Sequence, residues 1–235
     1  MQRREVLWGL ATGLTASLTG CALQRLPEVQ PQAAASEPVH SMRSPALGQQ
    51  WGYGKYNVYN SELVATELHR VQAIAPEIVV EIRSPMGMLL GTERHASWGQ
   101  LLQDPAWDMT QRFERPVPLW PASLALGARE FVNARYQTES GSFLYWVQIQ
   151  TTVTAWERLS LPVGAWDVWR VERFIRLAHP DVTRLETVRR DTLWLSPELG
   201  RWVVRERVGQ YRMPGGRKSN WFNEDHFRWE LLSWH

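Results

Sequence analysis

The sequence has little of three things that would point to a function, and each shortage excludes a class of protein. It contains one cysteine in 235 residues, Cys21, so no disulfide can form within the chain. After residue 20, no apolar stretch reaches the roughly 20 residues that a membrane-spanning helix needs. The formal net charge is only +2, and Arg3, Arg4 and Glu5 together supply half of it. A chain so close to neutral lacks the basic stripe that a nucleic-acid partner requires.

The first 21 residues are typical of an export signal. Basic residues 3–4 precede an apolar stretch over 6–18, which has the length of a signal-peptide core and is too short for a stable membrane anchor. The stretch ends in Leu18-Thr19-Gly20-Cys21, which resembles the lipobox of bacterial lipoproteins. In a lipobox the small residues admit a protease, and the cysteine thiol is the nucleophile that accepts the lipid. The alternative is a secretory signal that ends in a chance cysteine.

Lipidation of Cys21 would fix the chain to a bilayer, because several acyl chains on one residue exceed the single-chain limit for stable anchoring. No thiol would then remain for a redox centre or a cysteine metal site. By resemblance to enterobacterial lipoproteins, an aspartate after the cysteine would favour retention in the inner membrane; Ala22 stands there instead, so we expect the periplasmic face of the outer membrane. The pair Arg3-Arg4 loosely resembles a twin-arginine signal, and the export route stays open between that and general secretion.

The remaining chain divides into a tether and a folded domain. We expect residues 1–20 to be the signal peptide, 21–45 the lipidated N-terminus with a flexible Pro- and Ala-rich tether, and 46–235 a β-rich periplasmic domain. Period-two alternation over 143–154, 78–83 and 227–231 predicts strands with one polar face, and such strands joined by short turns form antiparallel sheets.

Local signals add turns and one short helix to this pattern. Ser196-Pro197-Glu198-Leu199-Gly200 predicts the turn of a hairpin over 193–208, and Pro214-Gly215-Gly216 predicts another turn. Residues 97–103 allow a short helix. The fold class that follows is mainly β with little helix, as a curved antiparallel sheet or half-barrel.

Two segments are similar to each other. The stretch 44–51 contains Leu47-Gly48 and the stretch 121–131 contains Leu126-Gly127, and each leads into a strand with aromatic residues. This repeat predicts two similar sheet-forming halves, either packed on each other or continuous as one curved sheet. A chance similarity is the alternative.

Two further stretches resemble uncharacterised proteobacterial envelope proteins. Leu161-Pro162-Val163-Gly164-Ala165-Trp166 is similar to their Val-Pro-Ala-Gly-Thr-Phe strand, with Val163 and Trp166 as departures. Residues 192–206 resemble their Tyr-Trp-Tyr-x-Pro-x-x-Gly hairpin. The resemblance covers the C-terminal third of the chain. It implies a half-barrel like that of the lipoprotein-carrier proteins, and it brings no established activity.

Tryptophan is unusually frequent, with 14 residues against six Tyr and six Phe. Filling the core of a thin sheet is the commoner use of such side chains, and an aromatic groove for a lipid, glycan or peptide is the functional alternative. The candidates for a ligand or partner surface are Trp166, Trp169, Trp194, Trp202 and Trp229.

A search for catalytic or metal-binding sets yields none. There is no Gly-x-Ser-x-Gly elbow, and the sequence at 215–219 departs from a phosphate loop. Glu224 and His226 could share one face of a strand as metal ligands, but a solvated strand end is the favoured interpretation. The arginines over 170–207 are expected to form cross-strand pairs with acidic residues on the wet face of the sheet. We therefore predict no metal, no cofactor and no enzymatic activity.

Two functions remain in competition. The first is a non-catalytic envelope lipoprotein that binds a protein partner or acts in envelope assembly. The second is a carrier or chaperone for a lipid or another apolar ligand, held in the concave side of a half-barrel. A hydrolase is a distant third, because nothing supplies a nucleophile and its base.

Overall fold

The computed structural model describes residues 30–214 and 220–235, and these contain no helix, hence none that could span a membrane. All regular elements are β-strands. They are β1 (Gln32–Ala33), β2 (Gln50–Asn57), β3 (Glu62–Ala73), β4 (Ile78–Arg83), β5 (Leu89–Ser97), β6 (Gln100–Asp104), β7 (Gln111–Pro118), β8 (Arg129–Thr138), β9 (Tyr145–Leu161), β10 (Gly164–Leu177), β11 (Glu186–Ser196), β12 (Arg201–Met213), β13 (Asn220–Asn223) and β14 (Phe227–Trp234).

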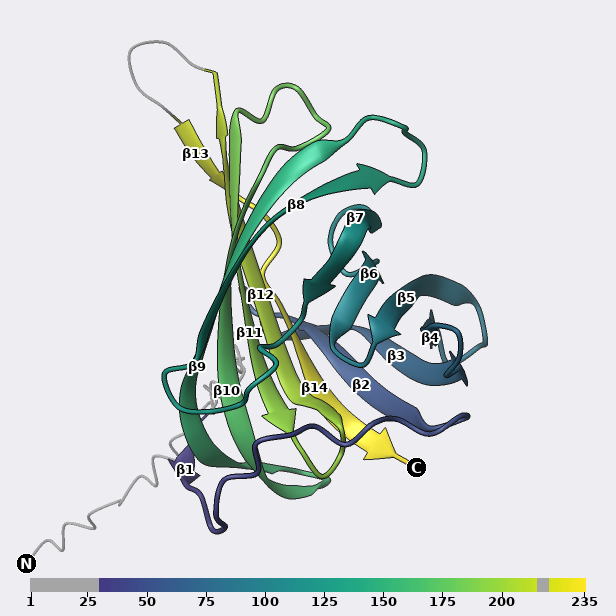
Figure 1. Ribbon diagram of the computed structural model, residues 1–235, viewed down its shortest axis with the longest axis vertical. Helices are drawn as coiled ribbons and strands as arrows, with labels where there is room; N and C mark the ends of the chain where they lie inside the picture. Colours follow the sequence, from purple (N-terminus) through teal and green to yellow (C-terminus); the bar gives the residue numbers. More distant parts are fainter. Residues whose placement is uncertain (1–29, 215–219) are drawn as a thin grey trace, which may run out of the picture.

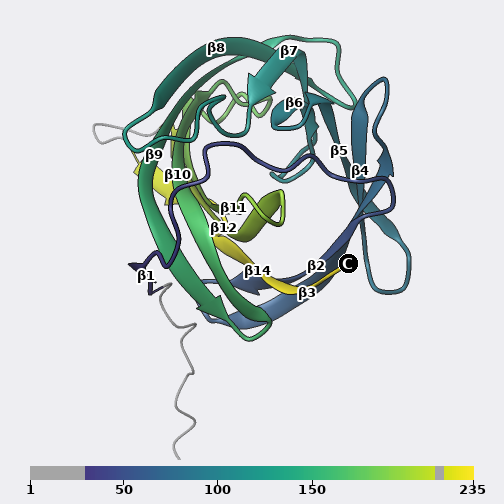
Figure 2. The same cartoon turned by 60° about the horizontal axis from the view of Figure 1, so that its bottom comes forward.

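The strands form one antiparallel sheet that closes on itself (Figures 1 and 2). The order runs from β9 through β10, β11, β12, β14 and β2 to β8, and β8 pairs back onto β9. The predicted fold class is thus confirmed as mainly β, and the curvature goes beyond a half-barrel to a closed barrel. β1 and β13 lie outside this ring, on β9 and β12.

The junction between β7 and β8 is short, and in the ring only the β5–β6 pairing has as few residue pairs. β7 and β8 pair over three residue pairs only, from Gln111↔Thr138 to Phe113↔Tyr136. Beyond them, residues 117–118 of β7 pair with β6 alone, and residues 129–135 of β8 pair with β9 alone. A side chain bridges the gap, because Arg115 donates a hydrogen bond to the Asn133 carbonyl.

The predicted repeat corresponds to two corners with the same hydrogen bonds. At Gly48 and Gly127 the backbone has φ of +80° in both cases, a conformation that suits glycine. Gly48 N–H donates to the Val71 carbonyl at 2.9 Å, and Gly127 N–H donates to the Val153 carbonyl at 2.9 Å. Gly48 precedes β2 and bonds near the end of β3, and Gly127 precedes β8 and bonds to the middle of β9. Each corner therefore joins the start of one strand to the strand that follows it in the sequence.

The N-terminal segment 30–49 crosses one end of the barrel, and we call it the strap (Figure 2). β1 pairs with β9, and indole N–H groups fix the next residues, with Trp156 donating to Ser36 and Trp169 donating to Val39 at 2.7 Å. The prediction of a flexible tether over 21–45 is therefore wrong for its second half, because indole donors and a free strand edge bind the backbone there. The first part of that tether lies outside the described residues.

The hairpin over β11 and β12 forms as predicted, and its turn folds into the barrel under the strap (Figure 2). Leu199 in that turn is buried, Arg43 N–H donates to the Pro197 carbonyl at 3.2 Å, and Trp98 Nε1 donates to the Gly200 carbonyl at 2.6 Å. The turn and the strap together cover this end of the barrel. The other predicted turn, at Pro214-Gly215-Gly216, falls mostly outside the described residues.

The predicted short helix over 97–103 is wrong. Ser97 ends β5, Gly99 makes a tight turn with φ of +88°, and residues from Gln100 onward form β6. Pairing of β5 with β6 and of β6 with β7 supplies hydrogen bonds to both edges of this short segment, so tertiary pairing overrides its local pattern.

Candidate functional site

The five tryptophans predicted to form a surface are all buried, at 7% exposure or less. Trp166, Trp169 and Trp194 belong to the core on the β10–β11 side, and the Trp194 N–H donates to a Glu157 carboxylate oxygen at 2.8 Å. Trp202 and Trp229 instead line a cavity inside the barrel. Buried indoles with internal acceptors pack well without reaching water. The lipobox residues Leu18, Thr19, Gly20 and Cys21 lie outside the described residues, so lipidation stays a prediction.

The barrel interior is charged, although the sequence pattern predicted these charged side chains on the outer face of the sheet. Five arginines expected on the wet face are instead buried at 3% exposure or less: Arg173, Arg189, Arg201, Arg205 and Arg207. They lie on the inward face of β10, β11 and β12. That expectation is wrong because arginine is mostly a surface residue, and only the register of the closed sheet places these side chains opposite buried carboxylates.

Asp191 on β11 is the centre of one group. Its carboxylate accepts hydrogen bonds from Arg173 at 2.7 Å, from Arg205 at 2.9 and 2.7 Å, and from Arg207 at 3.4 Å. Asp104 on β6 lies 3.5 to 3.6 Å from the Arg205 and Arg207 guanidinium groups. Arg205 and Arg207 therefore share two carboxylates, whereas Arg173 pairs with Asp191 alone.

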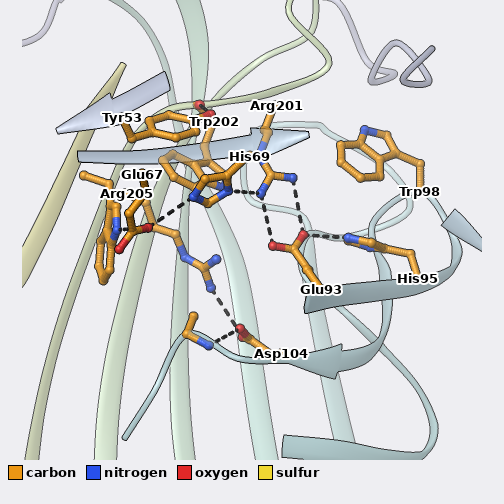
Figure 3. Close-up of polar contacts among 12 residues, drawn as sticks. Tyr53, Glu67, His69, Glu93, His95, Trp98, Asp104, Arg201, Trp202 and Arg205 are labelled. Atoms are coloured by element: carbon orange, nitrogen blue, oxygen red, sulfur yellow. Dashed lines mark hydrogen bonds and ion pairs between the residues drawn. The ribbon is translucent and has the colours of Figure 1, made fainter. Parts of the chain in front are cut away.

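A second group links the two halves of the chain (Figure 3). Glu93 on β5 accepts from Arg201 at 3.1 Å and pairs with His95 at 2.6 Å, and Arg201 also reaches His69 Nδ1 at 3.0 Å. His69 Nε2 in turn lies 3.2 Å from Glu67. The chain of contacts runs from β5 through β12 to β3.

These contacts set the ionisation of the buried groups. Burial alone would raise the pKa of Glu93, but the charge of Arg201 and the hydrogen bond with His95 hold it well below its ordinary value. Burial lowers the pKa of His69, and the nearby Arg201 charge lowers it further against the opposing effect of Glu67. Glu93 is therefore ionised and His69 neutral at neutral pH.

Two adjoining cavities open beside this network. The larger, about 440 Å³, and the smaller, about 280 Å³, share Lys55, Ala106, Trp107, Arg207 and Trp229 as lining residues. The larger is also lined by Arg184, Arg189, Tyr211, Phe227, Asp108 and Glu224. Its walls therefore combine aromatic rings with charges of both signs.

Trp107, between β6 and β7, occupies the wall between the cavities. The guanidinium carbons of Arg189 and Arg207 lie 4.4 and 4.9 Å from its ring centroid, within cation–π range. Arg189 also donates to Asp108 at 2.7 Å and to Glu224 at 2.7 Å. The cationic groups of this site are thus held in fixed positions by carboxylates and by an aromatic face.

The two residues considered as metal ligands are directed to different partners. Glu224 accepts from Arg184 and Arg189, both at 2.7 Å, whereas His226 pairs with Glu206 at 2.8 Å. Among residues 30–214 and 220–235, no group of three or more His, Cys, Asp or Glu side chains could hold a metal ion. What the site can do chemically is bind a polar group, since its fixed donors and acceptors are arranged around aromatic walls.

Comparison with known proteins gives fold relatives only. No family model matches the chain, and no curated protein matches its sequence. The chain is similar in structure to a putative lipoprotein from Parabacteroides distasonis, with a TM-score of 0.55 and 14% identity over 85% of this chain and 100% of that one. It is also similar to a putative exported protein with a YmcC-like fold from Bacteroides fragilis, with a TM-score of 0.53 and 14% identity over 84% and 100%.

The two solved structures share the fold of this chain, and at this identity they share nothing more that can be carried over. Both are covered over their full length. The proteobacterial strand and hairpin resemblance has no counterpart among these comparisons and stays a prediction.

Proposed function

We propose that the protein is a lipid-anchored component of the bacterial envelope, held through Cys21 at the periplasmic face of the outer membrane, and that its barrel binds a protein partner without catalysing a reaction. The lipobox-like Leu18-Thr19-Gly20-Cys21 motivates the anchor. The fold is one that a putative lipoprotein and a putative exported protein also have, which agrees with an extracytoplasmic location.

The observation that carries the binding role is a group of exposed apolar side chains in and beside the turn between β4 and β5. The β4–β5 turn presents Met86 at 94% exposure and Met88 at 62%, and Leu89 and Leu90 follow at the start of β5. Single exposed apolar residues are ordinary, but four in one hairpin tip are typical of a protein contact. Methionine suits such surfaces because its flexible, polarisable side chain adapts to a partner.

The alternative function, a carrier of an apolar ligand, meets a chemical obstacle in the barrel interior. An acyl chain needs a cavity lined mainly by apolar groups. Both cavities here are lined by ionised side chains, among them Arg207, which lies within reach of Asp191 and Asp104. Placing an acyl chain there would desolvate these charges further, which is unfavourable.

The anchor and the partner site are tested separately. The Cys21→Ser chain should no longer fractionate with membranes, and unchanged flotation would contradict the anchor. For the partner site, Met86→Asp/Met88→Asp should abolish recovery of a stoichiometric protein after crosslinking in cells, while Val163→Asp, an exposed residue at the strap end, should not. Equal recovery with both variants would contradict the proposed site. Bound lipid in native mass spectra of the purified protein would favour the carrier instead.

A further inference from the structure

The outer face of β8, β9 and β10 combines exposed aromatic rings with arginines. Phe131 is 61% exposed, Trp146 44% and Phe174 42%. Phe131 on β8 is paired with Gln150 on β9, which is paired with Phe174 on β10, so the two phenyl rings stand in one row across the three strands. The inward face of the same strands carries the buried Val147 and Ile149, which fixes the rings on the outside.

Arginines flank this row, and three of them are without acidic partners. Arg129 and Arg135 lie on β8, and Arg190 lies on β11 next to Phe174. All three are exposed, and none forms an ion pair with any described residue. Arg176, on the same face, is paired with Glu186 at 2.8 Å. We call the surface made by Arg129, Phe131, Arg135, Trp146, Phe174 and Arg190 the arginine–aromatic flank.

The chain enters the barrel on this side. β1 pairs with β9 at Gln32↔Arg158 and Ala33↔Glu157, while the other edge of β9 is taken by β10 at the same residues. β1 therefore occupies the edge of β9 that β8 occupies further along. Cys21 precedes Gln32 by eleven residues, which span at most about 40 Å when extended. From Arg158 to Trp146 along β9 is also about 40 Å at 3.3 Å per residue.

We propose that the arginine–aromatic flank lies against the surface of an anionic bilayer, the one in which the acyl chains of Cys21 are inserted. The inference rests on the anchor of the proposed function. Aromatic rings favour the interface between headgroups and acyl chains, and arginines near anionic headgroups add an attraction that falls off within a Debye length. A lipid anchor and a basic aromatic patch are two signals that together hold a protein on a membrane.

Such docking sets the orientation of the barrel. With the flank on the membrane, the barrel axis lies along the bilayer, and β3, across the ring from β9, faces away from it. An upright barrel held only by a loose tether would place neither side preferentially on the lipid. The two arrangements differ in which side chains approach the acyl chains, and this is measurable.

The test uses the lipidated chain in vesicles, with a single added thiol as the probe. Because Cys21 is the only cysteine and its thiol would be acylated, a bimane label reacts only at an introduced cysteine. Asn133→Cys places it in the flank on β8, and Gln72→Cys places it on β3 as the matched control, both at exposed polar positions. In vesicles of brominated phosphatidylcholine and phosphatidylglycerol at about 7:3, we expect bimane at 133 to be quenched at least about twice as strongly as at 72, since bromine quenches only at short range.

Charge reversal separates the flank from the anchor. Arg129→Glu/Arg135→Glu/Arg190→Glu should remove the excess quenching at 133 while the chain still floats with the vesicles, and Arg70→Glu on β3 should leave it unchanged. Raising the salt should weaken the quenching at 133 in the unaltered flank, because exposed charges are screened. Equal quenching at 133 and 72 in a chain that floats would overturn the docking and leave the anchor intact. A chain that does not float would overturn the anchor itself.

Discussion

At the scale of single residues, Asp191 is the carboxylate that neutralises most of the buried arginines on β10 and β12. It is completely buried and accepts hydrogen bonds from three arginines on two strands. Buried charges are tolerated only when paired and hydrogen-bonded, and removing one partner leaves the others uncompensated.

Asp191→Asn should therefore lower the free energy of unfolding by about 3–5 kcal/mol, since it leaves Arg205 and Arg207 with Asp104 alone and Arg173 with no carboxylate partner. Urea denaturation followed by tryptophan emission measures this. The matched control is Glu139→Gln, which breaks an exposed pair with Arg112 at 3.4 Å and should change stability by less than about 1 kcal/mol. Similar losses in the two variants would show that the interior pairs are no more important than surface ones.

The buried Glu93 and His69 predict how stability depends on pH. The pKa of His69 is lowered in the folded protein, so the unfolded chain takes up a proton first and stability begins to fall as the pH drops below about 6.5. The pKa of Glu93 is lowered well below its ordinary value of 4.5, so its contribution is complete above that value and is lost as the pH falls below it. Urea midpoints between pH 7 and pH 3 should decline throughout, and Glu93→Gln should flatten the part below about pH 4.5. A constant midpoint over this range would contradict both assignments.

At the scale of elements, the strap depends on a glycine in the turn that it covers. Gly200 has φ of +71°, and a Cβ at this position would meet the carbonyl oxygen of Arg43 in the strap. Gly200→Ala should therefore displace the strap from the turn as well as strain the backbone.

Limited proteolysis checks this expectation. Cleavage within 36–45 should become at least several times faster in Gly200→Ala than in the parent protein. Gly87→Ala is the control, because its φ of +84° carries the same strain but a Cβ there meets no atom. Equal protection of the strap in both variants would mean that the turn does not hold it.

The two Leu-Gly corners should respond alike to substitution. Gly48 and Gly127 have the same φ and equivalent hydrogen bonds, and a Cβ at either meets no atom within 4 Å. Alanine at either position should cost about 1–2 kcal/mol through backbone strain alone, and the two costs should add in the double variant because the corners bond to different strands, Gly48 to β3 and Gly127 to β9. Costs that differ by more than about 1 kcal/mol would show that the corners are not equivalent.

Many of the strands and turns could be predicted from the sequence, but most of the candidate site could not. Alternation predicted β4, β9 and β14, and Pro197 with Gly200 predicted the β11–β12 turn. Binary patterning assigns arginine to the surface and phenylalanine to the core, yet on β10 Arg173 is buried and its neighbour Phe174 exposed. One carboxylate that permits this, Asp191, lies directly opposite Arg173 in the register of β10 with β11, whereas only the closure of the sheet brings Asp104 on β6 within reach of the β12 arginines. The one signal in the sequence that could have indicated this buried charged face was the spacing of Arg201, Arg205 and Arg207, which all occupy odd-numbered positions of one strand.

At the scale of the whole molecule, the two halves are joined too tightly to be separate domains. β2 pairs with β14 over seven residue pairs, and the interior contacts from Glu93 to Arg201 and from Glu67 to Trp229 cross from one half to the other. Each half alone would expose buried charges as well as apolar surface.

Separate expression should therefore fail to give folded halves. Residues 121–235 alone should show no cooperative urea transition, whereas the complete chain should unfold in one transition with coincident far-ultraviolet circular dichroism and tryptophan emission. A cooperative transition in the half-chain would instead favour two packed domains.

The short β7–β8 junction is a place where the wall of the barrel can open locally. Three residue pairs close it there, against eight between β8 and β9, and the support beside it comes from Arg115 reaching the Asn133 carbonyl and from Arg173 reaching the Pro118 carbonyl. If these few hydrogen bonds opened, water could pass through the wall of the barrel to the ion pairs around Asp191, while the other strand pairings stayed intact. The hydrogen bond from the Arg173 guanidinium to the Pro118 carbonyl therefore helps to keep this part of the barrel wall closed.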